Sequence, residues 1–511
     1  MSLLLRGGNK LLAPGAGGVL GLPCLASLSL SAALVRPLVR PLSSHALPAA
    51  SSSSSSSDAP SSSSSSSSSD AQAADCPAPG VRDAERFRLT PSTEFWRTWD
   101  PRQDVPSARA LVAHALTELT GAGEGGRTSQ RYFASHLLRT SAFASLGAAG
   151  FLTHAATSAM RMTTPAGPTI AQPTPAALAD AGYRALLEAL AAYRQDGRRV
   201  AAGEYAFPWD MESSRHPQYR GVLRKAARFM FEATQTLRRR RAAEPDNLWV
   251  RGSVYPEYYK NTYHYQTDGW LSTHSSEVYE TSTESLFVGR QDAMQRLVLP
   301  PLMDHLANVA GRGASDVQQD QHSPPRVLEL ACGTGRLGTF VRDNLPYAEY
   351  HAVDLSPFYL ERARSNHRAW EKLRGAKLAR GAAGAHFYHD SIERVPDELA
   401  RVLGDDGGWF DAVYCVYTFH ELPMEAREAA VRTMFQALKP GGVAVLVDSI
   451  QLGDREPLDR SIGRFGDFNE PHYRGYISTD LGALFERAGF ACVEKEMNSS
   501  SKRLSFMKPT T

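Results

Sequence analysis

The stretch Arg326–Gly338, which reads RVLELACGTGRLG, decides how the second half of this 511-residue chain folds. Its apolar residues predict a buried strand over Val327–Leu330, followed by a glycine-rich turn and a helix. Gly333 and Gly335 have no Cβ atom, so the backbone can turn sharply and approach a ligand closely there. The free N–H groups and the positive end of the helix dipole point to the same place. Glu329 is the unusual residue of the strand, because a buried carboxylate needs a partner.

A second strand is predicted over Tyr350–Asp354, and its end also suits a ligand. Ser356 is a good N-cap, and Pro357 fits the first position of the helix that follows. Asp354 comes roughly twenty residues after the glycines, where an acidic side chain can accept hydrogen bonds from both hydroxyl groups of a ribose. The same spacing occurs in NAD-binding proteins, and a role for Asp354 in starting the helix alone also stays open.

A third element narrows the choice of family. Leu438–Gly442, which reads LKPGG, introduces an apolar strand over Val443–Asp448. Together with the ELACGTGRLG turn it resembles the class I S-adenosylmethionine (SAM)-dependent methyltransferases, where such a turn wraps the methionine end of SAM, and LKPGG is unusual in NAD-dependent dehydrogenases. The resemblance covers residues 326–509 in detail. It implies SAM as the cofactor and, as residues that bind it, Glu329, Ala331, Gly333, Gly335, Asp354, Leu355, Asp390, Ser391 and Ile392.

The last three of these residues follow a predicted strand over His386–His389. In the family that the chain resembles, an acidic residue here contacts the adenine amino group, and the next apolar residue covers the ring. Asp390 could instead only cap the loop, since aspartate often bonds to its own backbone in turns.

The candidate catalytic residues, His420 and Glu421, end the strand predicted within Trp409–Pro423. Ligands bind at such strand ends near the switch point of an open α/β sheet. A histidine there could act as a general base near neutral pH. It could also only position the acceptor, because many methyl transfers need no more than alignment and exclusion of water.

Two further segments are expected to cover the site. Residues 255–272 crowd aromatic and polar side chains together without helical or strand periodicity. They form either an aromatic contact between two domains or a lid over SAM and the acceptor, since aromatic faces suit a sulfonium cation. Gln451–Tyr476 is predicted to be irregular and to roof the acceptor pocket, because long loops are usually functional. The predicted substrate or lid residues are Tyr259, Tyr263, His264, Tyr265, Trp270 and Tyr473.

The predicted fold is α/β: a doubly wound, seven-stranded, Rossmann-like methyltransferase sheet with an antiparallel last strand, preceded by a mainly helical N-terminal region. Helices are expected at Ala176–Arg194, where Asp196-Gly197 should stop the first one, at Tyr219–Arg241 and at Glu277–Arg296. Ser478-Thr479 should cap a helix ending at Gly489. The predicted divisions are an organellar targeting leader (1–50), a Ser-rich disordered linker (51–81), the helical region (82–250), an aromatic lid or connector (251–300) and the methyltransferase domain (301–511).

The leader is basic, lacks acidic residues and is rich in Leu, Ala and Ser, which is typical of a transit peptide. We expect a mitochondrial location, with plastid as the alternative. The uncharged segment Leu11–Val35 leaves a secretory signal peptide or a signal anchor open as well. A net charge of +2 indicates no nucleic-acid partner, and no stable transmembrane segment is expected. Peripheral contact with an anionic membrane through Arg238–Arg241 stays open beside a solvated helix end.

No metal site is predicted, because the cysteines form no C-x-x-C pair and the histidines are scattered without ligand spacing. The sequence thus predicts direct in-line methyl transfer from SAM to a small-molecule acceptor, such as a quinone-type or lipid-type precursor. The alternative is a methyltransferase-like organellar assembly or scaffold protein that binds SAM without turnover.

Overall fold

A computed structural model describes most of the chain from residue 77 onward. The described residues are 77–105, 107–120, 126–159, 175–211, 224–225, 227–232, 235, 255–261, 266, 268–315, 324–378, 383–393, 395–404, 407–463 and 470–510. The predicted leader, most of the Ser-rich linker and most of the helix predicted at 219–241 lie outside these residues, as do Tyr263, His264 and Tyr265.

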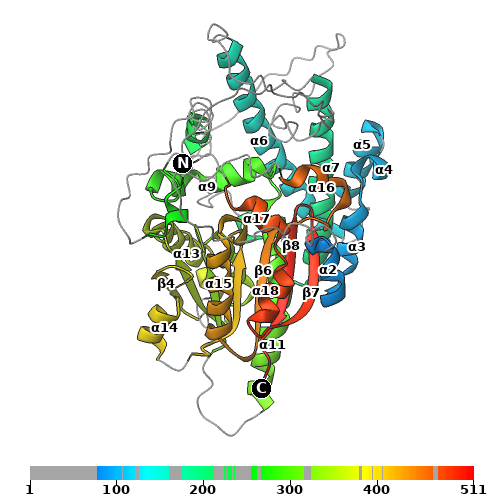
Figure 1. Cartoon of the computed structure of the whole chain (residues 1–511). Coiled ribbons are helices and arrows are strands. Elements are labelled where there is room, and N and C mark those ends of the chain that lie inside the picture. Colours follow the sequence, from blue (N-terminus) through cyan, green and yellow to red (C-terminus); the bar gives the residue numbers. More distant parts are fainter. Residues whose placement is uncertain are drawn as a thin grey trace, which may run out of the picture.

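Within the described residues, eight strands form one sheet in the order β1-β7-β8-β6-β5-β2-β3-β4 (Figure 1). Neighbouring strands are parallel, except that β8 runs antiparallel to both β6 and β7. This confirms the predicted doubly wound sheet with an antiparallel last strand. The strands are β1 (Arg88–Leu89), β2 (Arg326–Leu330), β3 (Glu349–Asp354), β4 (Ala385–His389), β5 (Phe410–Val416), β6 (Leu438–Ser449), β7 (Ala491–Asn498) and β8 (Ser501–Met507).

The sheet has eight strands where seven were predicted, because the N-terminal region adds one. Arg88 and Leu89 of β1 pair with Glu494 and Lys495 of β7 at the edge of the sheet. A two-residue strand carries no periodicity that a sequence could reveal, so only the pairing shows it.

Helices cover both faces of the sheet and bury two apolar cores. One face packs against α14 (Val395–Leu403), α15 (Met424–Ala437) and α18 (Leu481–Arg487). The other packs against α11 (Leu299–Ser315), α12 (Arg336–Asn344) and α13 (Pro357–Leu378). The strands are therefore buried on both sides, as parallel strands usually are.

The N-terminal helices pack onto the same two cores. Trp96 and Trp99 belong to one core, and Tyr132 and Tyr193 to the other. The long helices α6 and α7 stand beyond the ends of the strands (Figure 1). These elements are α2 (Pro79–Arg86), α3 (Pro91–Thr98), α4 (Pro101–Asp104), α5 (Ala108–Leu119), α6 (Gly126–Ala159), α7 (Pro175–Ala202) and the 3-10 turn η1 (Trp209–Met211). No helix among the described residues is both long and apolar enough to cross a membrane.

Two predicted boundaries in this region were wrong. The linker was expected to reach residue 81, but α2 begins at Pro79, and Gly80 packs so closely on Gly453 and Asp454 that a Cβ atom would not fit. Asp196-Gly197 does not stop α7. Asp196 is instead buried in the helix, where the guanidinium group of Arg296 binds its carboxylate.

The single helix predicted at Glu277–Arg296 is broken into α9 (Thr273–Leu286) and α10 (Gln291–Gln295), followed by the 3-10 turn η3 (Arg296–Val298). Val288 and Gly289 both have positive φ, at +54° and +81°. Gly289 also packs against the backbone of Thr140, where a Cβ atom would lie 3.1 Å from its Cα atom. The break is therefore set by the contact with α6, which local periodicity does not reveal.

The segment after β6 is more regular than predicted. It contains α16 (Glu456–Ile462) and α17 (Tyr473–Ser478), while residues 464–469 lie outside the described part. The expected cap at Ser478-Thr479 is also displaced: Asp480 caps α18, and its carboxylate accepts a hydrogen bond from the backbone N–H of Ala483. The remaining short turns are η2 (Glu257–Lys260) and η4 (Phe419–Glu421).

Candidate active site

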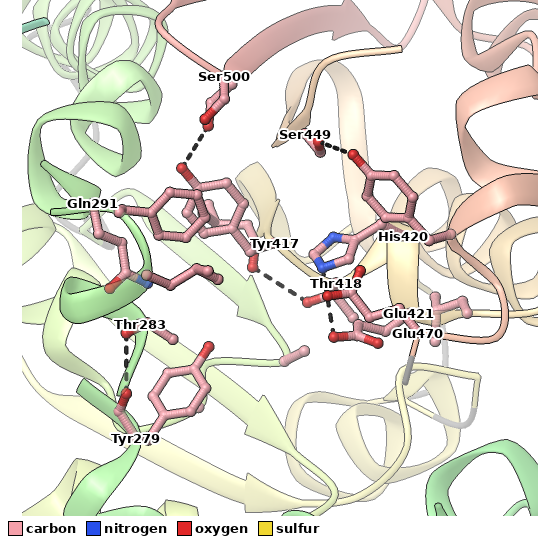
Figure 2. A pocket seen from close by; sticks show the side chains of 18 of the residues that line it. Tyr279, Thr283, Gln291, Tyr417, Thr418, His420, Glu421, Ser449, Glu470 and Ser500 are labelled. Carbon is pink, nitrogen blue, oxygen red and sulfur yellow. Dashed lines mark hydrogen bonds and ion pairs between the residues drawn. The ribbon is translucent and has the colours of Figure 1, made fainter. Parts of the chain in front are cut away.

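A cavity of about 340 Å³ lies at the carboxyl ends of the parallel strands. It is lined at one end by the glycine-rich turn after β2 and at the other by η4 and the end of β6. Figure 2 shows side chains from α9, η4 and the β7–β8 turn around it. Eleven of the predicted site residues line the cavity: Tyr259, Trp270, Ala331, Gly333, Asp354, Leu355, Ser391, Ile392, His420, Glu421 and Tyr473.

The glycines of the turn have different tasks. Ala331, Gly333 and Gly335 all have positive φ, at +55°, +55° and +67°. A Cβ atom on Gly333 would meet only Tyr359 Cδ1, at 4.0 Å, so the backbone there is open toward the cavity. A Cβ atom on Gly335 would lie 2.7 Å from that of Ala363 in α13. Gly333 therefore allows a ligand to approach, whereas Gly335 allows two helices to pack.

Asp354 fixes the turn from the end of β3. Its two carboxylate oxygens accept hydrogen bonds from the backbone N–H groups of Gly333 and Ser356, each at 2.8 Å. Burial raises the pKa of Asp354 to about 6, although both N–H groups lower it. A carboxylate has about four acceptor positions, so two remain for a ligand such as a ribose. Asp354 therefore orders the glycine-rich turn, and it also lines the cavity.

Glu329 does not reach the cavity. Its Oε2 atom accepts hydrogen bonds from the hydroxyl groups of Tyr350 and Tyr414, inside the sheet. Burial raises the pKa of Glu329 to about 7, even though both tyrosines lower it. A Cβ atom on Gly338 would clash with the Tyr350 hydroxyl, so this glycine makes room for the Glu329–Tyr350 contact. The carboxylate supports the turn from below in this structure, and its contact with SAM stays a prediction.

The loop after β4 contributes Ser391 and Ile392 to the cavity. Asp390 is buried beside them but does not line it, and its Oδ1 atom accepts the backbone N–H of Ser391. The structure thus supports the loop-capping alternative for Asp390 and leaves its contact with an adenine ring a prediction.

His420 is held between two carboxylates. Its Nδ1 atom lies 2.6 Å from Oδ1 of Asp448, and its Nε2 atom lies 3.5 Å from Oε1 of Glu421. Burial alone would lower the pKa of His420, but Asp448 and Glu421 raise it well above its usual value. The environment therefore favours the protonated ring at neutral pH, which argues against a resting general base.

The predicted lid packs on the cofactor side of the cavity. Tyr259, Leu271 and Leu355 form a small apolar cluster, and the rings of Tyr259 and Trp270 are 5.0 Å apart. The Ser356 hydroxyl donates a hydrogen bond of 2.5 Å to the backbone oxygen of Trp270. The segment therefore covers the turn after β3, while the acceptor end has other walls.

Helix α9 ties the N-terminal region to the glycine-rich turn. The Thr334 hydroxyl donates to Oε1 of Glu280 at 2.9 Å, and Arg336 Nη1 donates to Oε1 of Glu284 at 2.6 Å. Arg139 of α6 binds the same Glu284 carboxylate. Because these groups are buried, the turn and the helices beside it form one structural unit.

Beside the predicted Tyr473, the acceptor end contains residues that the sequence did not single out. The Tyr473 hydroxyl lies 2.8 Å from that of Ser449, and the Tyr417 hydroxyl lies 2.6 Å from that of Ser501. Asp448 was the one detectable residue, as an acid at the end of an apolar strand. Asp448 reaches the site only through His420, whereas the side chains that line the cavity also include Arg184, Glu188, Tyr279, Thr283, Phe287, Arg290, Gln291, Glu470 and Ser500.

These residues fit SAM. The open backbone at Gly333 and the spare acceptor positions of Asp354 suit its amino-acid and ribose parts. The aromatic rings of Tyr279 and Tyr417 and the carboxyl group of Glu421 line the same cavity and suit a sulfonium cation.

Comparison with known proteins agrees with this geometry. Residues 328–444 match the family model described as "Methyltransferase domain". An uncharacterized methyltransferase of Synechocystis is 28% identical over 175 residues, which are 34% of this chain and 69% of that protein. The trans-aconitate 2-methyltransferase of Pseudomonas paraeruginosa is 38% identical over 95 residues, which are 17% of this chain and only 33% of that enzyme.

Solved structures of similar fold include an O-methyltransferase family protein from Burkholderia thailandensis, with 15% identity and a TM-score of 0.35. The similarity covers 66% of this chain and 89% of that one. The glycine-rich turn, Asp354, the sheet order and the matched family model together lead to one conclusion. Residues 328–444 form a methyltransferase domain of the class I SAM-dependent type, and its cofactor is S-adenosyl-L-methionine.

Proposed function

We propose that this methyltransferase acts on a small molecule with an apolar body and one polar reactive group, such as a quinone-type or lipid-type precursor. The observation that carries the proposal is the single cavity that joins Gly333 and Asp354 to His420 and Tyr473. SAM supplies an electrophilic methyl group there. The acceptor forms a bond to the methyl carbon as the carbon–sulfur bond breaks, and S-adenosylhomocysteine leaves.

The walls of the acceptor end favour a small molecule over a macromolecule. Residues of α7, α9, α16, α17 and the β7–β8 turn surround it, including Glu188, Leu286, Leu458, Tyr473 and Ser500. Among the described residues, a wall formed by so many elements supports a small acceptor over a nucleic acid or a folded protein. One relative, the trans-aconitate 2-methyltransferase, is named for a small-molecule acceptor, which supports the proposed class of acceptor.

His420 is proposed to hold the acceptor by donating a hydrogen bond. Asp448 and Glu421 favour the protonated ring, and its Nε2–H, which faces Oε1 of Glu421 at 3.5 Å, is shared with an acceptor oxygen on the cavity side. Tyr473 and Tyr417 place hydroxyl groups at the same end. Alignment of the acceptor with the methyl group is then the main contribution to the rate.

The test is to incubate the protein with methyl-labelled SAM and a fractionated small-molecule extract, and to identify labelled products by mass spectrometry. We expect one labelled small molecule with wild type and less of it with His420→Ala. SAM binding without any labelled product, in extracts from several sources, would favour the scaffold alternative. Label on protein or nucleic acid instead would contradict the proposed acceptor class.

A further inference from the structure

Three side chains that the sequence left scattered meet at the end of the sheet opposite the cavity. Glu349 and His351 lie near the beginning of β3, and His386 lies near the beginning of β4. His351 and His386 are register partners on the two parallel strands. Glu349 precedes His351 by two residues, so its side chain points to the same face of the sheet.

The ligand atoms of the three residues have the spacing of a metal site. His386 Nε2 lies 3.0 Å from Oε1 of Glu349, and His351 Nε2 lies 3.6 Å from Oε2 of Glu349. All three ligand atoms lie within 4.8 Å of one another. Zinc bonds to nitrogen and oxygen are about 2.0–2.2 Å long, so tetrahedral ligands stand roughly 3.4 Å apart. Small side-chain adjustments would bring the three atoms around one ion.

The ring of His351 provides an independent indication. It is only 1% exposed, and its Nε2 atom has no hydrogen-bond partner among the described residues. Its Nδ1 atom lies 2.8 Å from the hydroxyl group of Tyr388. Such a contact on the second nitrogen is what fixes the ring of a metal-binding histidine.

We propose that Glu349, His351 and His386 bind a divalent transition-metal ion of the zinc type, with water as the remaining ligand. Two imidazoles and one carboxylate form a common zinc ligand set. His386 is half-exposed, which gives the ion a path from solvent. This site would reverse the prediction that the histidines have no ligand role.

The ion would act on stability instead of methyl transfer. The ligands come from the beginning of β3, whereas Asp354 ends that strand in the active site. An ion there would join β3 to β4, the edge strand. Arg326 limits the affinity, because its Nε atom donates to Oε2 of Glu349 at 2.8 Å and its charge repels a cation.

The test uses the full-length protein after treatment with a chelator, titrated with zinc by calorimetry and with cobalt by absorption spectroscopy. We expect one zinc ion per chain at this site and a rise in melting temperature with zinc concentration, since the ion binds only the folded state. The visible absorption of bound cobalt should indicate nitrogen and oxygen ligands.

The variants decide where the ion binds. His386→Ala and Glu349→Gln change half-exposed or partly buried side chains, so they should fold and lose the zinc-dependent shift. Tyr388→Phe should weaken zinc binding by roughly tenfold or more, as loss of such supporting contacts does. The matched control is His274→Ala, because His274 forms a comparable pair with Glu232, at 2.9 Å, that is not part of a three-residue cluster within the described part of the chain.

Two outcomes would overturn the proposal. If zinc gives no shift in the wild type, Glu349 and His386 form an ion pair only. If His386→Ala and Glu349→Gln keep the wild-type stoichiometry and shift, the ion binds elsewhere in the chain.

Discussion

The Nδ1 atom of His420 lies 2.6 Å from Oδ1 of Asp448, and the backbone N–H of His420 donates to the other oxygen of the same carboxylate at 3.3 Å. Asp448 is buried at the end of β6, while His420 belongs to η4 after β5. One carboxylate thus fixes both the ring and the backbone of the candidate acceptor-binding residue.

We predict that Asp448→Asn lowers the pKa of His420 and impairs turnover while SAM binding stays near normal. Loss of a charge-assisted hydrogen bond costs about 1.5–3 kcal/mol, which corresponds to a pKa change of about one to two units. The pKa can be followed by NMR titration of the His420 ring. An unchanged pKa would contradict the proposed pairing, and the pH profile would show whether turnover follows the protonated ring.

The same pair makes stability depend on pH. His420 has a folded-state pKa above its unfolded value, so its stabilising contribution is complete below about pH 6.5 and is lost as pH rises through the folded pKa. Urea denaturation between pH 6 and 10 measures the free energy of unfolding. We expect His420→Gln to lose less of this free energy toward alkaline pH than the wild type does. Equal pH slopes in the wild type and His420→Gln would show that the ring does not titrate differently on folding.

Asp354→Ala should weaken SAM binding by about 1.5–3 kcal/mol, or roughly 10- to 150-fold, because a charged acceptor is lost. The variant should also loosen the glycine-rich turn, since Gly333 and Ser356 both donate to this carboxylate. Isothermal titration with SAM measures the first effect, and His420→Ala is the control that should bind SAM almost normally. If His420→Ala weakens SAM binding more than Asp354→Ala does, the cofactor and acceptor ends of the cavity are assigned the wrong way round.

Glu329→Gln should stabilise the free protein at alkaline pH. The folded-state pKa of Glu329 is raised to about 7, so the wild type loses stability as pH rises between about 4.5 and 7. The full effect is on the order of 3 kcal/mol at 1.36 kcal/mol per pKa unit. Urea denaturation at pH 5 and pH 8 should show a gain for the variant only at pH 8. A loss at pH 8 would show that the charged carboxylate is needed by Tyr350 and Tyr414.

Glu284→Gln should destabilise the fold by about 3–5 kcal/mol, because it leaves Arg139 and Arg336 buried beside a neutral amide. SAM should also raise the melting temperature less, since Arg336 begins the helix after the glycine-rich turn. The control on the same helix is Glu277→Gln, which removes a more exposed pair with Arg228 and should cost less than about 1 kcal/mol. Equal losses in the two variants would contradict a special role for the buried cluster.

Removing residues 1–76 should leave the melting temperature and SAM affinity unchanged, whereas removing residues 1–86 should not. The longer deletion takes away Asp83, a buried partner of Lys495 and Lys502, and would leave those lysines with less countercharge. Thermal unfolding of both proteins measures the difference. Fusion of residues 1–76 to a fluorescent protein tests the proposed mitochondrial location against the plastid.

The sequence by itself determined the local features of this protein. The glycine-rich turn, Asp354 at the end of β3 and the Ser356-Pro357 helix start were all predictable, because each depends on residues adjacent in the chain. The apolar strands were predictable for the same reason, since strands buried on both faces read as short apolar runs.

Only the tertiary structure decided which distant residues meet. The pairs His420–Asp448, Glu329–Tyr350 and His351–His386 join residues from different strands or turns. Strand β1 exists because it pairs with β7, and the break between α9 and α10 exists because α6 packs against it. Hydrophobic periodicity predicts which face of a helix or strand is buried, but it does not predict which other element packs against that face. The chemistry of a buried carboxylate or imidazole depends on that partner, so its charge and its role were set by the fold.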